Sequence, residues 1–347
     1  YNKSATKAYP QGFIARYDGR ERAAVPNSIF TCFRLDNEEV HPIFLENLFI
    51  SNLHRNWLRG RIAVGARAHG SLNVSDDDLM ALPVPLPPVA RRREEQQKIA
   101  DCLMSLDEVI VAQGRKVEAL KAHKRGLMQQ LFPREGETRP RLRFPEFRNA
   151  PEWLVARVCD LFETSSGGTP DRKTKEYWGR GVPWVTTSLV GFNVITDAEE
   201  FVSEAGLKNS SAREFPKGTV IVAMYGQGKT RGQVALLGVD AATNQACAAI
   251  LPSEDIASEF VFFNLCGRYD ELRSLSNSGG QENLSQGLIR ELPFRYPKSK
   301  SEQAAIIDCF TSLENQITAE TARLAALKTH KQGLMQQLFP APEATGA

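Results

Sequence analysis

A glycine, a lysine and a threonine in succession, at 228–230, have the residue types and spacing of a site that could bind nucleotide phosphates. Ala223, Gly228, Lys229 and Thr230 stand at the spacing of a relaxed phosphate-binding loop and follow a run of strand-forming residues. In such a loop, backbone N–H groups and the lysine hold nucleotide phosphates. The loop must open a helix, however, and residues 231–238 have the pattern of a second strand after a tight turn. We therefore favour a hairpin with outward-pointing polar side chains, and nucleotide binding is the alternative.

Other catalytic and metal-binding patterns are absent from the sequence. It has no glycine-rich dinucleotide fingerprint, no serine nucleophile elbow and no metalloprotease helix motif. The cysteines form no CxxC pair, and the five histidines do not cluster with them. We therefore predict no catalytic residue, no metal site and no cofactor-binding residue in this chain, and we expect the cysteines to be buried free thiols. The six cysteines are Cys32, Cys102, Cys159, Cys247, Cys266 and Cys309.

An internal repeat is the strongest pattern in the chain. Residues 94–133 align with residues 301–340 without a gap, at a shift of 207, with 22 identities in 40 positions. Both copies end in the same eight residues, GLMQQLFP. Upstream, Asn-Val-Ser at 73–75 matches Asn-Leu-Ser at 283–285. The repeated unit is therefore a globular segment followed by a helix.

Apolar residues in both helix copies alternate at spacings of four and three, which is the periodicity of a coiled coil. Gln113 and Lys124 interrupt the first apolar seam, and Glu320 and Lys331 interrupt the second at the equivalent positions. A parallel pair would bury Lys124 against Lys331. We therefore predict an antiparallel pair in which Lys124 faces Glu320 and Gln113 faces Lys331; the alternative is two unrelated amphipathic helices, each covering its own domain. The apolar seam residues are Ile99, Leu103, Leu106, Ile110, Val117, Leu120, Leu127 and Leu131, then Ile306, Phe310, Leu313, Ile317, Leu324, Leu327, Leu334 and Leu338.

Together these patterns predict an α+β protein with an internal pseudo-two-fold repeat. Two similar mixed α/β segments are separated by two long antiparallel coiled-coil helices. We place the first segment at 1–90, its helix at 91–133, a charged linker at 134–150, the second segment at 151–297, its helix at 298–340 and a tail at 341–347. In the second segment we expect strands at 182–187, 219–224, 233–237 and 246–251 and a helix near 257–274.

The charges are nearly balanced, with 43 Lys and Arg against 41 Asp and Glu and a net charge of +2. Such a chain does not grip nucleic acid through a basic patch alone. If DNA is the ligand, partner chains must supply much of the phosphate clamp. We find no long apolar run and no signal-peptide pattern, and we expect a cytoplasmic location without membrane contact.

Short motifs mark the entry to the second segment and the exit from it. The entry carries Leu-Arg-Phe-Pro-Glu-Phe at 142–147, then Trp153, Gly-Gly-Thr-Pro at 167–170, Tyr-Trp at 177–178 and Pro-Trp at 183–184. The exit carries Asn-Leu-Ser at 283–285, Leu-Pro at 292–293, Glu-Gln at 302–303 and the final GLMQQLFP. In this combination, which covers most of residues 70–340, the chain resembles the specificity subunits of Type I restriction-modification enzymes.

The resemblance implies two target-recognition domains, each reading half of a split site in double-stranded DNA. The two long helices between them would recruit two methyltransferase subunits, which would bind S-adenosylmethionine and methylate adenine. Motor-nuclease subunits would cleave unmodified DNA, so this chain would have no catalytic activity of its own. The chain departs from the family pattern in its first segment, which has about 90 residues before the helix against about 150 in the second, with Tyr1 near the position of Tyr225. The first recognition domain is therefore expected to be partial, without about 70 residues of its N-terminal part.

Polar and basic side chains on protruding elements are the candidates for DNA contact, because base edges and phosphates are read by such groups. In the second segment they are Gln227, Lys229, Thr230 and Arg231 in the hairpin turn, Thr186, Thr187 and Ser188 at a strand end, and Arg172, Lys173 and Lys175 for the DNA backbone. In the first segment they are Lys3, Lys7 and Arg55. The structural alternatives are a solvated charged loop at 172–175 and a simple chain turn at 186–188. A solitary DNA-binding or chromosome-organising protein with a coiled-coil spacer is the other functional alternative.

Overall fold

The computed structural model describes residues 1–19, 21–25, 27–36, 38–62, 72–226, 229–275 and 284–339. The chain divides into two compact units: unit 1 comprises Tyr1–Glu118 and Thr318–Ala347, and unit 2 comprises Ala119–Ile317. Two long helices, α4 (Arg92–Leu131) and α10 (Lys300–Leu338), each contribute one part to each unit. Their bounds agree with the helices that the repeat predicted.

The main sheet of unit 2 has five strands, in the order β2 (Thr164–Ser166), β10 (Cys247–Ile250), β7 (Val220–Ala223), β8 (Val234–Leu237) and β4 (Asn193–Ile195). Every residue of β7, β8 and β10 is buried, as their continuous apolar runs require of central strands. These three strands confirm the predictions at 219–224, 233–237 and 246–251. The outer strands β2 and β4 have three residues each, which is too short for a periodic pattern to reveal them.

Two smaller sheets complete unit 2. One has four strands, in the order β5 (Phe201–Val202), β3 (Trp178–Val185), β9 (Ala241–Thr243) and β6 (Glu214–Phe215). The other pairs β1 (Leu154–Arg157) with β11 (Pro293–Tyr296). Strand β3 overlaps the strand expected at 182–187 and begins earlier, because its N-terminal half pairs with β5 across a register shift between Trp178 and Val182.

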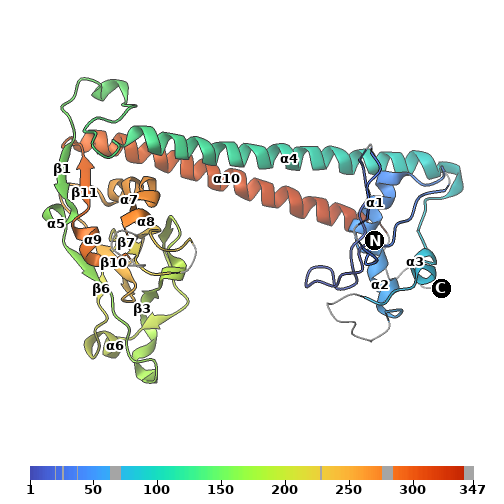
Figure 1. Ribbon diagram of the computed structural model, residues 1–347, viewed down its shortest axis with the longest axis horizontal. Coiled ribbons are helices and arrows are strands. Elements are labelled where there is room, and N and C mark those ends of the chain that lie inside the picture. The colour runs from blue at the N-terminus through green and yellow to red at the C-terminus, as the bar shows by residue number, and fades with distance from the viewer. Residues whose placement is uncertain are drawn as a thin grey trace. The chain divides into compact units, whose positions relative to one another are not determined.

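Helices and short turns cover these sheets. The helix expected near 257–274 is two helices, α7 (Ser258–Gly267) and α8 (Tyr269–Leu275), and Figure 1 shows them between the long helices and strands β7 and β10. The shorter elements are α5 (Val158–Leu161), α6 (Glu204–Lys208), α9 (Gln286–Arg290), η2 (Pro145–Phe147), η3 (Lys175–Tyr177) and η4 (Thr187–Leu189).

Aromatic rings join the long helices to the globular part of unit 2. Phe132, just after α4, stacks on Phe310 of α10 with ring centroids 5.8 Å apart. Phe260 of α7 lies 5.6 Å from Phe132 and 5.6 Å from Trp153. All four side chains are buried in one continuous core, so these ends of the two helices fold as part of the domain.

Residues 134–150, expected as a linker, are fastened to unit 2 by a buried ion pair. Arg143 donates two hydrogen bonds of 2.7 Å to the carboxylate of Glu302, and the Trp153 indole donates a third of 3.0 Å. The side chains of Arg143 and Glu302 are 9% and 1% exposed. Arg143 also donates to the carbonyls of Ala150 and Pro151, so a single guanidinium holds this segment against the start of α10.

Unit 1 contains α1 (Pro42–Ile50), α2 (Leu53–Arg59), α3 (Asp76–Met80), the short η1 (Val89–Arg91) and its parts of the long helices. Its described residues form isolated bridges and no strand: Asn2 pairs with Phe13 on one side and with Phe30 on the other. Phe44 of α1 and Phe339 lie 5.5 Å apart in its core. The pair corresponds to Phe260 and Phe132 in unit 2.

Equivalent hydrogen bonds show the internal repeat in three dimensions. The side-chain carbonyl of Gln96 accepts a hydrogen bond from the N–H of His41, just before α1. Gln303, its counterpart in the repeat, accepts one from Ala257, just before α7. Ser75 and Ser285 each cap the helix that follows, α3 and α9. The repeat therefore includes the elements that pack on the long helices as well as the helices themselves.

The long helices run antiparallel within each unit, as predicted, but in a different register. Lys124 forms an ion pair with Glu314, not with Glu320, and Lys331 pairs with Asp107 instead of Gln113, at 2.6 Å. Gln113 donates to the carboxylate of Glu320 at 2.6 Å. The prediction paired only polar residues of the apolar seam, whereas Asp107 and Glu314 lie beside the seam and provide charges of opposite sign for both lysines. Since Asp107 and Glu314 are equivalent in the repeat, the same ion pair occurs once in each unit.

Candidate nucleic-acid interface

Loops from several strands meet at one end of the sheets of unit 2. In the antiparallel pairing, Ala223 at the end of β7 lies opposite Cys247, and Ser166 at the end of β2 lies opposite Ala248. Strand β9 leads into β10 through three residues, and β3 runs parallel to β9, so both of these strands end on the same side. We call this surface the loop end; its described residues are 167–174, 186–192, 224–226, 229–233 and 244–246.

Two glycines allow the first of these loops to lie directly against its neighbours. A Cβ on Gly167 would stand 2.0 Å from the Thr243 carbonyl oxygen, and one on Gly168 would stand 2.3 Å from the Ser211 carbonyl oxygen. The Gly168 N–H donates to Thr243, and the Thr169 hydroxyl donates to the side chain of Gln245. The Gly-Gly-Thr-Pro motif therefore joins the loop at 167–174 to the loop at 244–246.

The hairpin between β7 and β8 carries the glycine-lysine-threonine triplet. Its strands pair antiparallel, and Thr230 is followed by a turn and β8 in place of a helix. The hairpin expected from the sequence is therefore present, and the helix that a nucleotide-binding loop requires is not found among these residues. Lys229 is exposed, while Thr230 and Arg231 are half-buried; Gln227 lies outside the described residues.

Tyr269 of α8 fixes the position of this hairpin. Its hydroxyl donates a 2.6 Å hydrogen bond to the carbonyl of Lys229, and Arg273 donates one of 2.7 Å to the same hydroxyl. The Tyr269 ring also meets Phe192 edge to face at 5.2 Å. The hairpin and the loop at 186–192 are thus joined through α8. Tyr269, Arg273 and Phe192 were not predicted, because nothing in their spacing links them to residue 229.

The strand-end candidates form a compact turn at the loop end. Thr186 precedes η4, and its hydroxyl lies 2.6 Å from that of Ser188, with Thr187 between them. Phe192 closes the loop with a φ of 60°, a left-handed conformation that is uncommon for a bulky residue. The structure therefore brings these three residues to the same end of the sheets as the hairpin.

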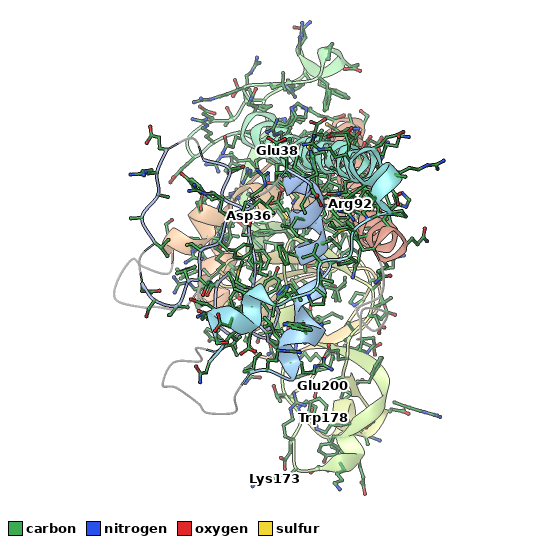
Figure 2. The ribbon with its side chains drawn as sticks, turned by 90° about the vertical axis from the view of Figure 1, so that its right-hand side faces the viewer. Asp36, Glu38, Arg92, Lys173, Trp178 and Glu200 are labelled. Carbon is green, nitrogen blue, oxygen red and sulfur yellow. The ribbon has the colours of Figure 1, made fainter. Side chains whose placement is uncertain are left out.

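Arg172 is held by an acid and two aromatic rings. Its guanidinium donates hydrogen bonds of 2.6 and 3.0 Å to the carboxylate of Glu200 and lies 4.0 Å from the ring centre of Trp178 and 4.4 Å from that of Trp184. These hydrogen bonds hold the pKa of the Glu200 carboxyl below its usual value. Lys173 and Lys175 are exposed beside this cluster, and in Figure 2 Lys173 lies farther out than Trp178 and Glu200.

The candidates in unit 1 are spread over separate elements. Lys3 lies 3.4 Å from Asp76, which also accepts a hydrogen bond from Thr31. Lys7 lies in an exposed bend and Arg55 on the exposed side of α2. Figure 2 labels Arg92 at the start of α4 in the same unit, where it pairs with Glu39 at 2.7 Å. No sheet end gathers the three candidates, because the described part of unit 1 has no sheet.

Thiols and acids form no metal site among the described residues. All six cysteines are free. Cys247 is buried, and burial raises the pKa of its thiol to about 12. Cys159, Cys266 and Cys309 are half-buried. The prediction of buried thiols is wrong for Cys32 and Cys102, which are exposed; Cys102 precedes the seam residue Leu103 and so lies on another side of α4. In the described part of the chain, no helix has the length and apolarity needed to cross a membrane.

The fold and the motifs agree with one family. The chain belongs to the family of the Type I restriction modification DNA specificity domain, whose model matches residues 151–329. The match begins just before β1, includes every strand of unit 2 and ends within α10.

Curated relatives carry the same description. The Type I restriction enzyme MjaIX specificity subunit of Methanocaldococcus jannaschii is 28% identical over 169 residues, which cover 47% of this chain and 38% of that protein. The EcoR124I/EcoR124II specificity subunit of Escherichia coli is 26% identical over 203 residues, 55% of this chain and 49% of the relative. The chain spans less than half the length of these two relatives.

Solved structures share the fold. The HsdS subunit from Thermoanaerobacter tengcongensis matches with a TM-score of 0.53 and 17% identity over 86% of this chain and 70% of that one. A chain from a structure of a type I restriction-modification system matches with a TM-score of 0.60 and 18% identity, over 87% and 71% of the two chains.

Proposed function

We propose that this chain is the DNA-sequence-reading subunit of a Type I restriction-modification complex and has no catalytic activity of its own. The observation that carries the proposal is the family match over residues 151–329, because that range contains the whole loop end. The relatives are specificity subunits by name. The gathering of polar and basic side chains from separate loops at one sheet end supports the same function.

At the loop end, the hairpin and the turn at 186–188 suit the reading of base edges. Lysine contacts guanine N7 and O6, and threonine and serine hydroxyls accept and donate to several base edges in the major groove. Lys229, Thr230 and Thr186 to Ser188 therefore provide direct readout in this proposal, together with Gln227 and Arg231. The loop at 171–175 faces the DNA backbone, and phosphate contacts there position the domain without reading sequence.

The proposal extends to the repeat and to partner chains. Two recognition domains, at residues 1–90 and 151–297, each read half of a split site, and the paired helices hold two methyltransferase subunits. S-adenosylmethionine binds in those subunits, which methylate adenine, and motor-nuclease subunits cleave unmodified DNA. A net charge of only +2 supports a role for partner chains in DNA binding. In the proposed complex, those partners provide many of the cations that contact DNA phosphates.

Co-expression with a methyltransferase subunit from the same restriction-modification operon tests the proposal. We expect a stable complex with two methyltransferase subunits for each copy of this chain, and new adenine methylation at a split motif across the host genome. Lys229→Ala with Thr230→Ala should relax or abolish the motif while the complex still assembles. Tight, sequence-specific DNA binding by the chain alone, without a complex, would favour the solitary DNA-binding protein instead.

A further inference from the structure

The three cations of the loop at 171–175 differ in what they contact. Arg172 is engaged by the Glu200 carboxylate and by the faces of Trp178 and Trp184. Lys173 and Lys175 are exposed, and within the described part of the chain neither ammonium forms an ion pair. All three side chains have the same formal charge, but among the residues that the structure describes only Arg172 is paired with an acid.

Arg172 is poorly placed to act as a phosphate ligand. Its guanidinium donates through both terminal nitrogens to one carboxylate and lies over two aromatic rings, while 49% of the side chain is exposed. A phosphate that approached Arg172 would also approach Glu200, and the two anions would repel each other. A lysine ammonium without an ion pair carries no such cost.

The same tryptophans that hold Arg172 also hold the backbone of this loop. The Trp178 indole donates a 3.1 Å hydrogen bond to the Asp171 carbonyl, and the Trp184 indole donates one of 3.5 Å to the Gly168 carbonyl. The Asp171 carboxylate in turn accepts the Lys173 N–H at 3.0 Å. The backbone of Lys173 is therefore held by Asp171, which is itself held by Trp178 of the Arg172 cluster.

We infer that Arg172 is a positioning residue, clamped by Glu200, Trp178 and Trp184, and that Lys173 and Lys175 make the phosphate contacts of this loop. The inference rests on the proposed DNA-binding function and assigns separate tasks to three neighbouring cations. The clamp orders the loop before DNA arrives, so that the lysines lose less conformational freedom on binding.

Replacing the acid separates this assignment from the simpler one in which all three cations bind phosphate. Glu200→Gln weakens the clamp, and Glu199→Gln removes the same charge from the exposed neighbouring position, whose side chain forms no hydrogen bond or ion pair with the described residues. If Arg172 positions the loop, Glu200→Gln binds DNA several-fold more weakly than Glu199→Gln. If Arg172 is itself a phosphate ligand, releasing it makes Glu200→Gln bind more tightly than Glu199→Gln, and the inference is overturned.

Binding is measured by fluorescence anisotropy of a labelled mixed-sequence duplex with the full chain, between about 50 and 200 mM salt. Lys173→Ala is expected to lower the slope of log affinity against log salt by about one unit and to reduce affinity about threefold at the higher salt. Lys217→Ala is the matched control, because Lys217 is exposed just before β7, at the opposite end of that strand from the loop end. Equal slopes for Lys173→Ala and Lys217→Ala would remove the phosphate role of Lys173.

Tryptophan emission provides a readout that does not depend on DNA. Glu200→Gln should shift the emission of Trp178 and Trp184, whereas Glu199→Gln and Lys173→Ala should leave it unchanged. An unchanged emission in Glu200→Gln would contradict the clamp even if DNA binding fell. Failure of the unaltered chain to bind any duplex in a salt-dependent way, both alone and together with a methyltransferase subunit, would instead remove the proposed DNA-binding function, and this inference with it.

Discussion

Two glutamates at equivalent positions of the repeat have opposite surroundings. Glu302 is buried between Arg143 and Trp153, whereas Glu95 is exposed at the start of α4. The amino-acid type and the neighbouring sequence are the same, Glu-Gln in both copies. The difference arises because residues 134–153 fold over Glu302 in unit 2, and the described residues of unit 1 contain no such segment over Glu95.

At the residue scale, we therefore expect alanine substitution of the two glutamates to change the free energy of unfolding by very different amounts. Glu302→Ala leaves the Arg143 charge buried without its acid and should lower the free energy of unfolding by about 3 to 5 kcal/mol. Glu95→Ala removes an exposed side chain and should change it by less than about 0.5 kcal/mol. Urea unfolding followed by tryptophan fluorescence compares the two variants; similar midpoints would show that the buried ion pair contributes little.

At the scale of elements, the paired helices depend on charges beside the apolar seam. The same lysine-to-acid contact occurs once in each unit, as Lys331 with Asp107 and as Lys124 with Glu314. An apolar seam alone permits several registers that differ by whole heptads, and the charged pairs select among them.

A double-mutant cycle tests this register. Lys331→Ala and Asp107→Ala should be coupled by about 0.5 kcal/mol, a modest value because the Asp107 side chain is 49% exposed and solvent screens the pair. Lys331→Ala and Gln113→Ala should be additive within about 0.3 kcal/mol. Thermal unfolding of the single and double variants gives both values. Coupling to Gln113 in place of Asp107 would restore the register expected from the seam.

The hairpin between β7 and β8 depends on an element that follows it in the chain. Tyr269→Phe removes only the hydroxyl that holds the Lys229 carbonyl, and it should weaken DNA binding about fivefold with the fold unchanged, since one hydrogen bond contributes about 1 kcal/mol. Tyr296→Phe in β11 is the control, because no hydrogen bond of its hydroxyl is found among the described residues. Equal affinities of the two variants would show that α8 does not position the hairpin for binding.

At the scale of the whole molecule, the balance of charges bears on the strength of DNA binding. The net charge is +2. A charge so close to zero does not favour strong DNA binding by this chain alone.

The corresponding prediction concerns affinity with and without a partner. The chain alone should bind duplex DNA weakly and lose most of that binding by about 200 mM salt. Addition of a methyltransferase subunit should raise the affinity at least tenfold and steepen the salt dependence, because the partner contributes further phosphate contacts. Anisotropy titrations over a salt series measure both quantities. An affinity unaffected by the partner would contradict the proposal that the partner subunits contribute phosphate contacts.

The sequence by itself determined the features that depend on local periodicity or on repetition. The repeat, both long helices and the central strands β7, β8 and β10 follow from apolar spacing and from self-similarity. The antiparallel orientation of the helices follows from Lys124 and Lys331, which a parallel pair would bury against each other. The hairpin was also predictable, because the strand-like run after Thr230 excludes a helix.

Only the tertiary structure decided which residues meet across long separations. The helix register depends on Asp107 and Glu314, which contact lysines 224 and 190 positions away. The engagement of Arg172 depends on Glu200, 28 residues later, and the position of Lys229 depends on Tyr269, 40 residues later. Apolar periodicity shows which face of an element is buried, but the pairing of individual polar groups is set by how the elements pack, and that is decided by the fold as a whole.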